Sequence, residues 1–73
     1  MQYFEQIKRI RKAKGISQTE MAQKLETTQQ QYSKYETGTQ EMPVRQLIRV
    51  CNALNASADE ILGLAPGAQN EQE

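Results

Sequence analysis

Two short helices joined by a tight turn are predicted for residues 17–38, which have the sequence SQTEMAQKLETTQQQYSKYETG. Ser17 and Thr28 are each followed three residues later by Glu or Gln, the pattern of a capping box at the start of a helix. Gly38 is typical of the residue that follows a helix end. Only two residues separate Leu25, in the first helix, from the cap of the second. The two helices must therefore cross steeply, as in a helix-turn-helix unit.

The second of these helices has an apolar side and a polar side. Tyr32 and Tyr35 share the inner side at about 100° per residue, so both are expected in the core rather than stacked on bases. The outer side carries Gln30, Ser33, Lys34 and Thr37, with Gln29 at its N-terminal end. This side has no acid, and Gln offers a donor and an acceptor that can bind adenine together. A solvated polar face is the alternative, but the helix-turn-helix frame favours base contact for Gln29 and Gln30.

Helical periodicity extends along the chain and predicts five short helices. The first spans about residues 2–14, and its apolar stripe is Tyr3, Phe4, Ile7, Ile10 and Ala13. A fourth begins at Pro43, and its apolar residues are Leu47, Ile48, Val50, Cys51 and Leu54. Asn55 is expected to end it in the left-handed conformation, and Ser57 begins a fifth helix that reaches Gly63. We therefore expect an all-α domain at residues 1–64, followed by a disordered polar tail at residues 65–73.

The composition excludes several functions. The 73 residues contain no His and one Cys, which removes His-based acid–base catalysis, Cys–His pairs and multi-cysteine metal sites. We expect no enzyme, no catalytic residue, no metal and no cofactor. Cys51 cannot form a disulfide within the chain, which fits a reducing cytoplasm. No apolar run approaches the ~20 residues of a membrane span, so no membrane is expected as a partner.

The formal net charge is zero, but the charges are segregated. All nine Lys and Arg residues lie in residues 1–49 with five of the nine acids, which gives this part +4 and residues 50–73 −4. Such segregation indicates a cationic face. A solvated helix followed by an acidic tail is the alternative. The first helix carries Lys8, Arg9, Lys12 and Lys14, which either solubilise it or contact a DNA backbone.

The order of these motifs resembles the helix-turn-helix domain of the Cro and phage-repressor type, called the XRE family. The resemblance covers residues 7–64. It rests on Ile10-Arg11…Gly15-Ile16-Ser17-Gln18, Met21-Ala22…Leu25, Tyr35-Glu36-Thr37-Gly38, Met42-Pro43…Leu47-Ile48 and Ala56-Ser57-Ala58-Asp59-Glu60-Ile61-Leu62. It implies a compact, five-helix, lambda-repressor-like domain. The run Thr27-Thr28-Gln29-Gln30 is similar to the start of the recognition helix in lambdoid phage repressors, where two successive Gln residues recognise A·T-rich half-sites.

The resemblance also implies roles for individual residues. The positions that face the bases of the major groove are Thr28, Gln29, Gln30, Ser33 and Lys34. Gln18 matches the position that binds a phosphate and braces the first recognition Gln. The positions that contact phosphates beyond the groove are Thr37, Thr39 and Gln40. Arg11 and Glu36 match a pair that often forms a salt bridge between the first and third helices; two separately solvated charges are the alternative.

Two departures from the family pattern affect these expectations. Glu26 stands where the turn usually has Gly, and a positive φ there costs about 1 kcal/mol for a residue with a side chain. Thr39-Gln40-Glu41 stand where relatives often carry Lys or Arg. The second departure predicts a modest, salt-sensitive affinity for DNA.

The leading hypothesis is a sequence-specific DNA-binding transcriptional regulator, a repressor of phage, prophage or plasmid type. One recognition helix contacts too few base pairs to be selective, so a homodimer on a pseudo-palindromic operator is expected. The apolar residues expected at the dimer contact are Ile61, Leu62 and Leu64. The alternative is a protein-binding module, an antitoxin or anti-repressor that holds a partner protein such as a toxin.

Overall fold

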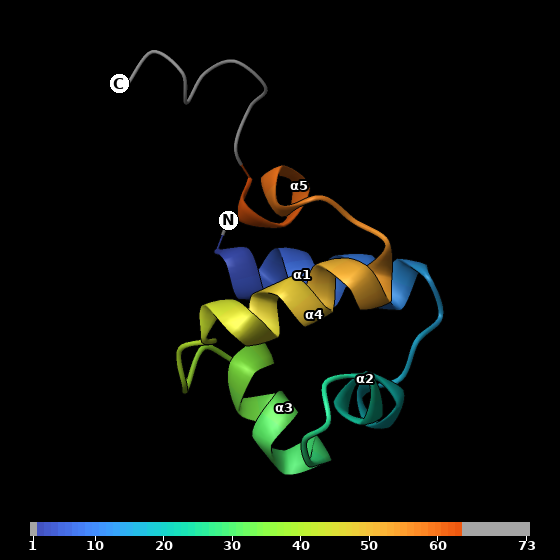
Figure 1. Cartoon of the computed structure of the whole chain (residues 1–73), viewed down its shortest axis with the longest axis vertical. Helices are drawn as coiled ribbons and strands as arrows, with labels where there is room; N and C mark the ends of the chain where they lie inside the picture. Colours follow the sequence, from blue (N-terminus) through green and yellow to red (C-terminus); the bar gives the residue numbers. More distant parts are fainter. Residues whose placement is uncertain (1, 64–73) are drawn as a thin grey trace.

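The computed structural model describes residues 2–63, and this part of the chain contains five α-helices (Figure 1). They are α1 (Tyr3–Ala13), α2 (Gln18–Lys24), α3 (Gln29–Glu36), α4 (Val44–Leu54) and α5 (Ala58–Leu62). No strand occurs in this part, so the prediction of an all-α, five-helix fold is confirmed. Within the same residues, no helix combines the length and the apolar character needed to cross a bilayer. The predicted domain end at Leu64 and the tail at residues 65–73 lie outside the described residues.

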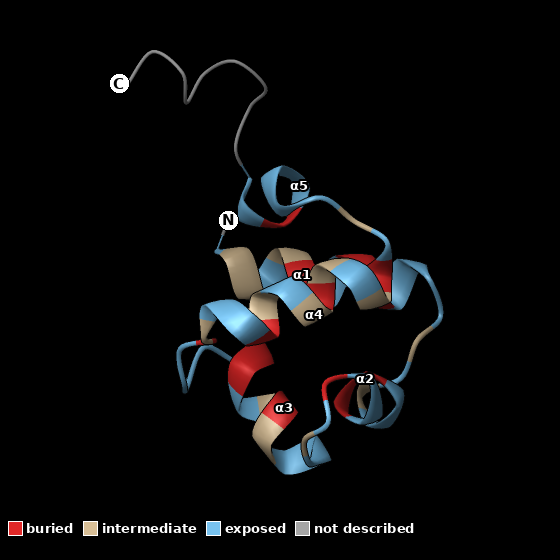
Figure 2. Cartoon of the chain, viewed as in Figure 1, coloured by how far each residue is buried: buried red, intermediate tan, exposed pale blue. Residues whose placement is uncertain are grey.

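The helices lie in three layers, with α1 and α4 in the middle (Figure 1). Helix α5 packs on one side of this pair, whereas α2 and α3 pack on the other and against each other. The buried positions lie mainly where the helices face one another (Figure 2). The large side chains that are fully buried are Ile7, Met21, Leu25, Tyr32, Val50, Leu54 and Ile61. Each such side chain contributes about 1.5–3 kcal/mol by leaving water. Tyr35 is also buried, so the prediction that both α3 tyrosines belong to the core is confirmed.

The helix starts follow the predicted capping residues. A side-chain hydroxyl accepts a backbone N–H at 3.1 Å at the start of three helices: Ser17 for α2, Thr28 for α3 and Ser57 for α5. The return contact of a capping box occurs at α1 instead, where the Glu5 carboxylate accepts the Gln2 N–H at 2.9 Å. Each hydroxyl satisfies one of the backbone donors that a helix start leaves unpaired, which fixes where these short helices begin.

Two apolar residues lie outside the core. The sequence placed Ala13 on the apolar stripe of the first helix, and it named Ile48 only among the apolar residues of the fourth. Ala13 at the end of α1 is exposed, and 56% of the Ile48 surface is exposed on α4. Helix α4 buries Gln46, Val50 and Leu54, which are spaced four residues apart. A residue two positions from Val50 lies about 200° around the helix, so Ile48 faces away from the core.

The turn between α2 and α3 departs from ideal helix-turn-helix chemistry at Glu26. This residue has a φ of 58°, in the left-handed region expected from its place in a turn where Gly is usual. Asn55 also adopts a positive φ, 52°, and ends α4 as predicted. The structure therefore has left-handed backbone at Glu26 and at Asn55, as expected from the sequence.

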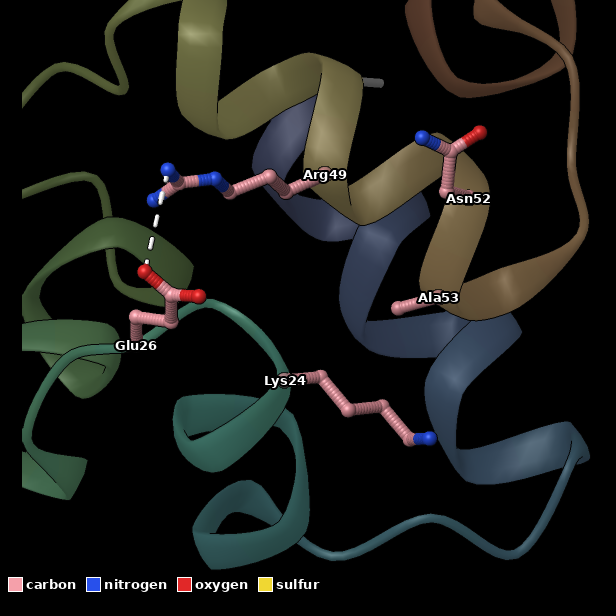
Figure 3. Close-up of a pocket in the computed structure, with 5 residues that line it drawn as sticks. All are labelled: Lys24, Glu26, Arg49, Asn52 and Ala53. Carbon is pink, nitrogen blue, oxygen red and sulfur yellow. Dashed lines mark ion pairs between the residues drawn. The ribbon is translucent and has the colours of Figure 1, made fainter.

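Helix α4 holds this turn from outside. The Leu25 carbonyl, which α2 leaves unpaired at its end, accepts hydrogen bonds from Gln46 Nε2 and Arg49 Nη1, each at 3.3 Å. Arg49 Nη2 also lies 3.9 Å from Glu26 Oε1 (Figure 3). This ion pair crosses a shallow hollow lined by Lys24, Glu26, Arg49, Asn52 and Ala53 (Figure 3). Contacts from a third helix thus fix the path of the chain from α2 into α3.

Candidate nucleic-acid interface

The outer face of α3 presents polar side chains to solvent. Thr28, Gln29, Gln30 and Lys34 are exposed, and Ser33 is half-buried. The inner face buries both tyrosines, so the helix cannot rotate without opening the core. No acid lies in the first turn, which leaves the partial positive charge of the helix start available to an anion. This face is therefore fixed in orientation and suited to contact a polyanion.

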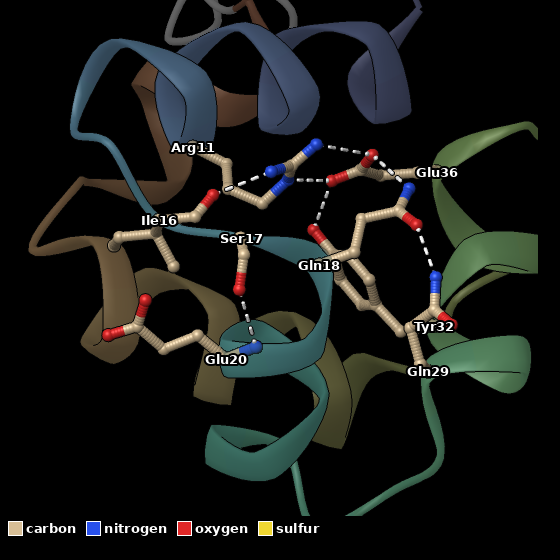
Figure 4. A network of polar contacts seen from close by, with 8 residues as sticks. All are labelled: Arg11, Ile16, Ser17, Gln18, Glu20, Gln29, Tyr32 and Glu36. Atoms are coloured by element: carbon tan, nitrogen blue, oxygen red, sulfur yellow. Dashed lines mark hydrogen bonds and ion pairs between the residues drawn. The ribbon is translucent and has the colours of Figure 1, made fainter.

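Two predicted site residues from different helices contact each other. Gln29 Nε2 donates to Gln18 Oε1 at 2.9 Å (Figure 4). Gln18 Nε2 in turn donates to Glu36 Oε1 at 3.0 Å. The start of α2 thus braces the first residue of α3, in the arrangement that the family resemblance implies.

Behind this contact lies a buried ion pair between Arg11 and Glu36, as the resemblance implies. Their side chains are 7% and 1% exposed. Arg11 donates from Nε and Nη2 to the two carboxylate oxygens of Glu36, and from Nη1 to the Ile16 carbonyl at 2.6 Å. The Tyr32 hydroxyl donates to Glu36 as well (Figure 4). With Gln18, three side chains therefore satisfy one carboxylate and connect α1, α2 and α3.

Burial and the hydrogen bonds of this network together shift the pKa of each ionisable member. Burial by itself would raise the pKa of Glu36, but the bonds from Arg11, Tyr32 and Gln18 outweigh it and leave the pKa below its ordinary value. The hydrogen bond to Glu36 raises the pKa of Arg11. Burial and then the bond to Glu36 raise the pKa of the Tyr32 phenol. At neutral pH the pair is charged and the phenol is a donor, so the network is complete.

The loop after α3 contains the three residues expected at phosphates, all exposed. The Thr37 hydroxyl donates to the Ser33 carbonyl at 3.0 Å and lies 2.9 Å from the Thr39 hydroxyl. Either threonine must therefore turn its hydroxyl away before it donates to a phosphate. Gln31 Nε2 donates to Gln40 Oε1 at 2.9 Å. This bond uses the oxygen of the Gln40 amide and none of its N–H groups. Of the three, Gln40 is the residue arranged to donate outward.

The first turn of α1 supports this loop from behind. Gly38 has a φ of 79°, and a Cβ placed there would lie 2.6 Å from Phe4 Cζ. The Tyr3 hydroxyl accepts the Met42 N–H at 3.1 Å. Gly38 is therefore required both by its backbone conformation and by the aromatic ring against it.

Two hydrogen bonds that support this interface were not predicted from the sequence, those of the Tyr32 hydroxyl and of Gln46. The Tyr32 hydroxyl bond to Glu36 could have been found, because residues four apart on a helix are neighbours. The buried Gln46 gave no signal, because its carbonyl partner is fixed by tertiary packing. The basic residues of the first helix, Lys8, Arg9, Lys12 and Lys14, are exposed, and Arg9 donates to Gln6.

The residues expected at a dimer contact have different environments. Ile61 is fully buried in the core of its own chain, so it supports that core rather than an external surface. Leu62 is 41% exposed, and Leu64 lies outside the described residues.

Leu62 and Leu47 line a hollow of about 230 Å³ together with Tyr3, Glu41 and Met42. Val44 and Ile48, 72% and 56% exposed, lie on the same helix as Leu47. We call Val44, Leu47, Ile48 and Leu62 the α4–α5 apolar surface.

Comparison with known proteins places this geometry in context. Residues 7–61 match a family model described as helix-turn-helix. The chain is 37% identical over 70 residues to the uncharacterized HTH-type transcriptional regulator YqaE of Bacillus subtilis (strain 168), covering 96% of this chain and 58% of that protein. It is 41% identical over 60 residues to the SPbeta prophage-derived uncharacterized HTH-type transcriptional regulator YonR of the same organism, covering 82% and 56%. The chain thus spans less than three-fifths of the length of these relatives. No solved structure gives a significant match.

Proposed function

Because this chain belongs to the helix-turn-helix family, we propose that it is a sequence-specific DNA-binding transcriptional regulator that places α3 in the major groove. One observation carries the proposal: the exposed side of α3 holds amide and hydroxyl groups without an acid, and α2 braces its first residue. Both relatives are named as HTH-type transcriptional regulators, which supports the same function here.

Gln29 and Gln30 are the proposed base contacts. A Gln side chain accepts from adenine N6 and donates to N7, so two successive Gln residues suit an A·T-rich half-site. Thr28, Ser33 and Lys34 share the groove-facing side. Lys34 is the one cation among these residues, so phosphate attraction is modest and affinity falls as salt rises.

A homodimer on a pseudo-palindromic operator is proposed because one α3 contacts too few base pairs. Leu62 and the rest of the α4–α5 apolar surface form the proposed contact, with the two α3 helices about 34–36 Å apart, one turn of DNA. Helix α5, with Asp59 and Glu60, packs on the side of α1 and α4 opposite to α3. Its acids are therefore kept away from phosphates. Repression, by blocking polymerase or a competing regulator in the cytoplasm, is the proposed outcome, and the prophage origin of YonR supports it.

The first experiment is selection of bound DNA from a random pool. Gln30→Ala is then expected to weaken binding to the selected site by about 1–3 kcal/mol and to leave binding to random DNA nearly unchanged. Asn52→Ala, at an exposed amide on α4, is the control and should change neither. Equal loss on both DNAs would contradict base contact by Gln30. If no sequence is selected even at low salt, the protein-binding alternative is favoured instead.

The dimer is tested with probes that carry one or two half-sites. Leu62→Glu is expected to abolish cooperative binding to the two-site probe and to leave the weak half-site affinity intact. Asn52→Glu adds the same charge outside the α4–α5 apolar surface and should preserve cooperativity. If one half-site binds as tightly as the full palindrome, the dimer is wrong.

A further inference from the structure

A chain of hydrogen bonds joins a buried charge to the surface of α3 (Figure 4). The Glu36 side chain is 1% exposed, and its Oε1 accepts from Gln18 Nε2 at 3.0 Å. Gln18 is half-buried, and its Oε1 accepts from the exposed Gln29 Nε2 at 2.9 Å. Two bonds thus separate a carboxylate inside the domain from an amide at the proposed DNA surface.

The carboxylate determines the orientation of both amides. An ionised carboxylate only accepts hydrogen bonds, so Gln18 must turn its NH₂ group toward Glu36. The carbonyl oxygen of Gln18 then faces Gln29, and this oxygen also only accepts. Gln29 must therefore turn its own NH₂ group inward. Its carbonyl oxygen and one remaining N–H are left for an external partner.

This orientation distinguishes between the two purines. In the major groove adenine presents the N6 donor and the N7 acceptor, whereas guanine presents two acceptors, O6 and N7. An amide that offers one oxygen and one N–H matches adenine. An amide of reversed orientation uses its oxygen toward Gln18 and offers only N–H groups, which match guanine.

We propose that Glu36 is a positioning residue for base recognition, which acts through Gln18 to orient the Gln29 amide so that this position favours adenine over guanine. The inference rests on the proposed DNA binding and adds a specificity-determining residue that does not touch DNA. Arg11 belongs to the same device, because its two bonds to Glu36 hold the carboxylate in the geometry that receives Gln18.

The test compares two bases at one position of the DNA site that the full chain selects from a random pool. That position is identified as the one whose base preference is lost with Gln29→Ala. There, an adenine–thymine pair is replaced by hypoxanthine opposite cytosine, which presents the major-groove acceptors of guanine without its amino group. The parent protein is expected to favour adenine by about tenfold or more.

Gln18→Met keeps the length of the side chain and removes both bonds. It is expected to reduce the preference for adenine to about twofold, because Gln29 can then adopt either orientation. The preference at the position that depends on Gln30 should stay unchanged, and a thermal melt confirms that the variant is folded. If Gln18 only braced Gln29 or only contacted a phosphate, Gln18→Met would lower the affinities for the adenine site and for the hypoxanthine site by the same factor. An unchanged ratio would therefore overturn the proposal.

Glu36→Gln provides the opposite perturbation. An amide at this position can donate to Gln18, which lets both Gln18 and Gln29 reverse, so the preference should shift toward hypoxanthine. Retention of the parent preference in folded Glu36→Gln would overturn the proposal; if this variant does not fold, Gln18→Met decides. Failure of the parent to select any site refutes DNA recognition itself. A selected site whose adenine preference depends on Gln29 but not on Gln18 refutes only the orienting role.

Discussion

Replacing Arg11 with Ala should remove a large part of the stability of the domain. The change leaves Glu36, whose side chain is 1% exposed, without its cation, and the Ile16 carbonyl without its donor. Breaking a buried pair from one side costs about 3–5 kcal/mol. A chain of this length is expected to unfold with about 4–11 kcal/mol in total, at roughly 0.05–0.15 kcal/mol per residue.

The unpaired carboxyl can limit this loss by taking up a proton. At pH 7 that costs about 3.7 kcal/mol for a Glu whose pKa in the unfolded chain is near 4.3, and about 1.4 kcal/mol less for each unit of lower pH. In the variant, burial without Arg11 raises the folded pKa of Glu36 above the unfolded value. The variant is therefore relatively more stable at low pH and loses stability as pH rises through that folded pKa.

Denaturant unfolding followed by circular dichroism, near pH 7 and near pH 5, measures both effects. The deficit of Arg11→Ala relative to the parent should shrink at the lower pH. Arg9→Ala is the matched control, because Arg9 is exposed on the same helix and its guanidinium contacts Gln6. Its loss should stay below about 1 kcal/mol. An Arg11→Ala deficit no larger than that of the control, or one that does not change with pH, would refute the reasoning.

Three further changes test other parts of the fold. Burial raises the pKa of Tyr32 in the folded domain above its value of about 10 in the unfolded chain, so the domain loses stability as pH rises past about 10 and the unfolded chain ionises first. In Tyr32→Phe the free energy of unfolding, measured with denaturant, should therefore fall less between neutral pH and pH values above about 10. Gly38→Ala should lower the melting temperature more than Gly15→Ala, because both have positive φ but only Gly38 lies against Phe4, and equal shifts would contradict this. Glu26→Gly should stabilise the domain by about 0.5–1 kcal/mol by relieving its positive φ; a decrease would show that its side-chain contact outweighs the strain.

The fold could be predicted from the sequence because its signals are local. Cap residues, the left-handed stop at Asn55 and the inner tyrosines of α3 each depend on a few neighbouring positions. The exposure of Ile48 could not be predicted, because the five apolar residues of α4 spread around too much of the helix to define one inner stripe. The choice between them depends on Gln46, which turns inward to reach the Leu25 carbonyl on another helix.

The candidate site could be predicted only in part. The outer face of α3 follows from its inner face, so the positions of Gln29 and Gln30 required nothing beyond helical spacing. The contact between Gln18 and Gln29 was available only through the family resemblance, because its partners lie on two helices whose crossing angle is a tertiary property. Likewise, Tyr32 was recognised as apolar core, but its hydroxyl has a partner that burial alone does not reveal.

The support of the α2–α3 turn by α4 sets an order of events during synthesis. Gln46 and Arg49 follow Leu25 by 21 and 24 residues, so the ribosome releases the turn before the side chains that hold it. A nascent chain that has reached only α3 has no partner from α4 for the Leu25 carbonyl, while Glu26 must adopt its unfavourable φ. The emerging polypeptide therefore gains these contacts to the α2–α3 turn, and with them the final form of the proposed DNA-contacting surface, only after α4 has been translated.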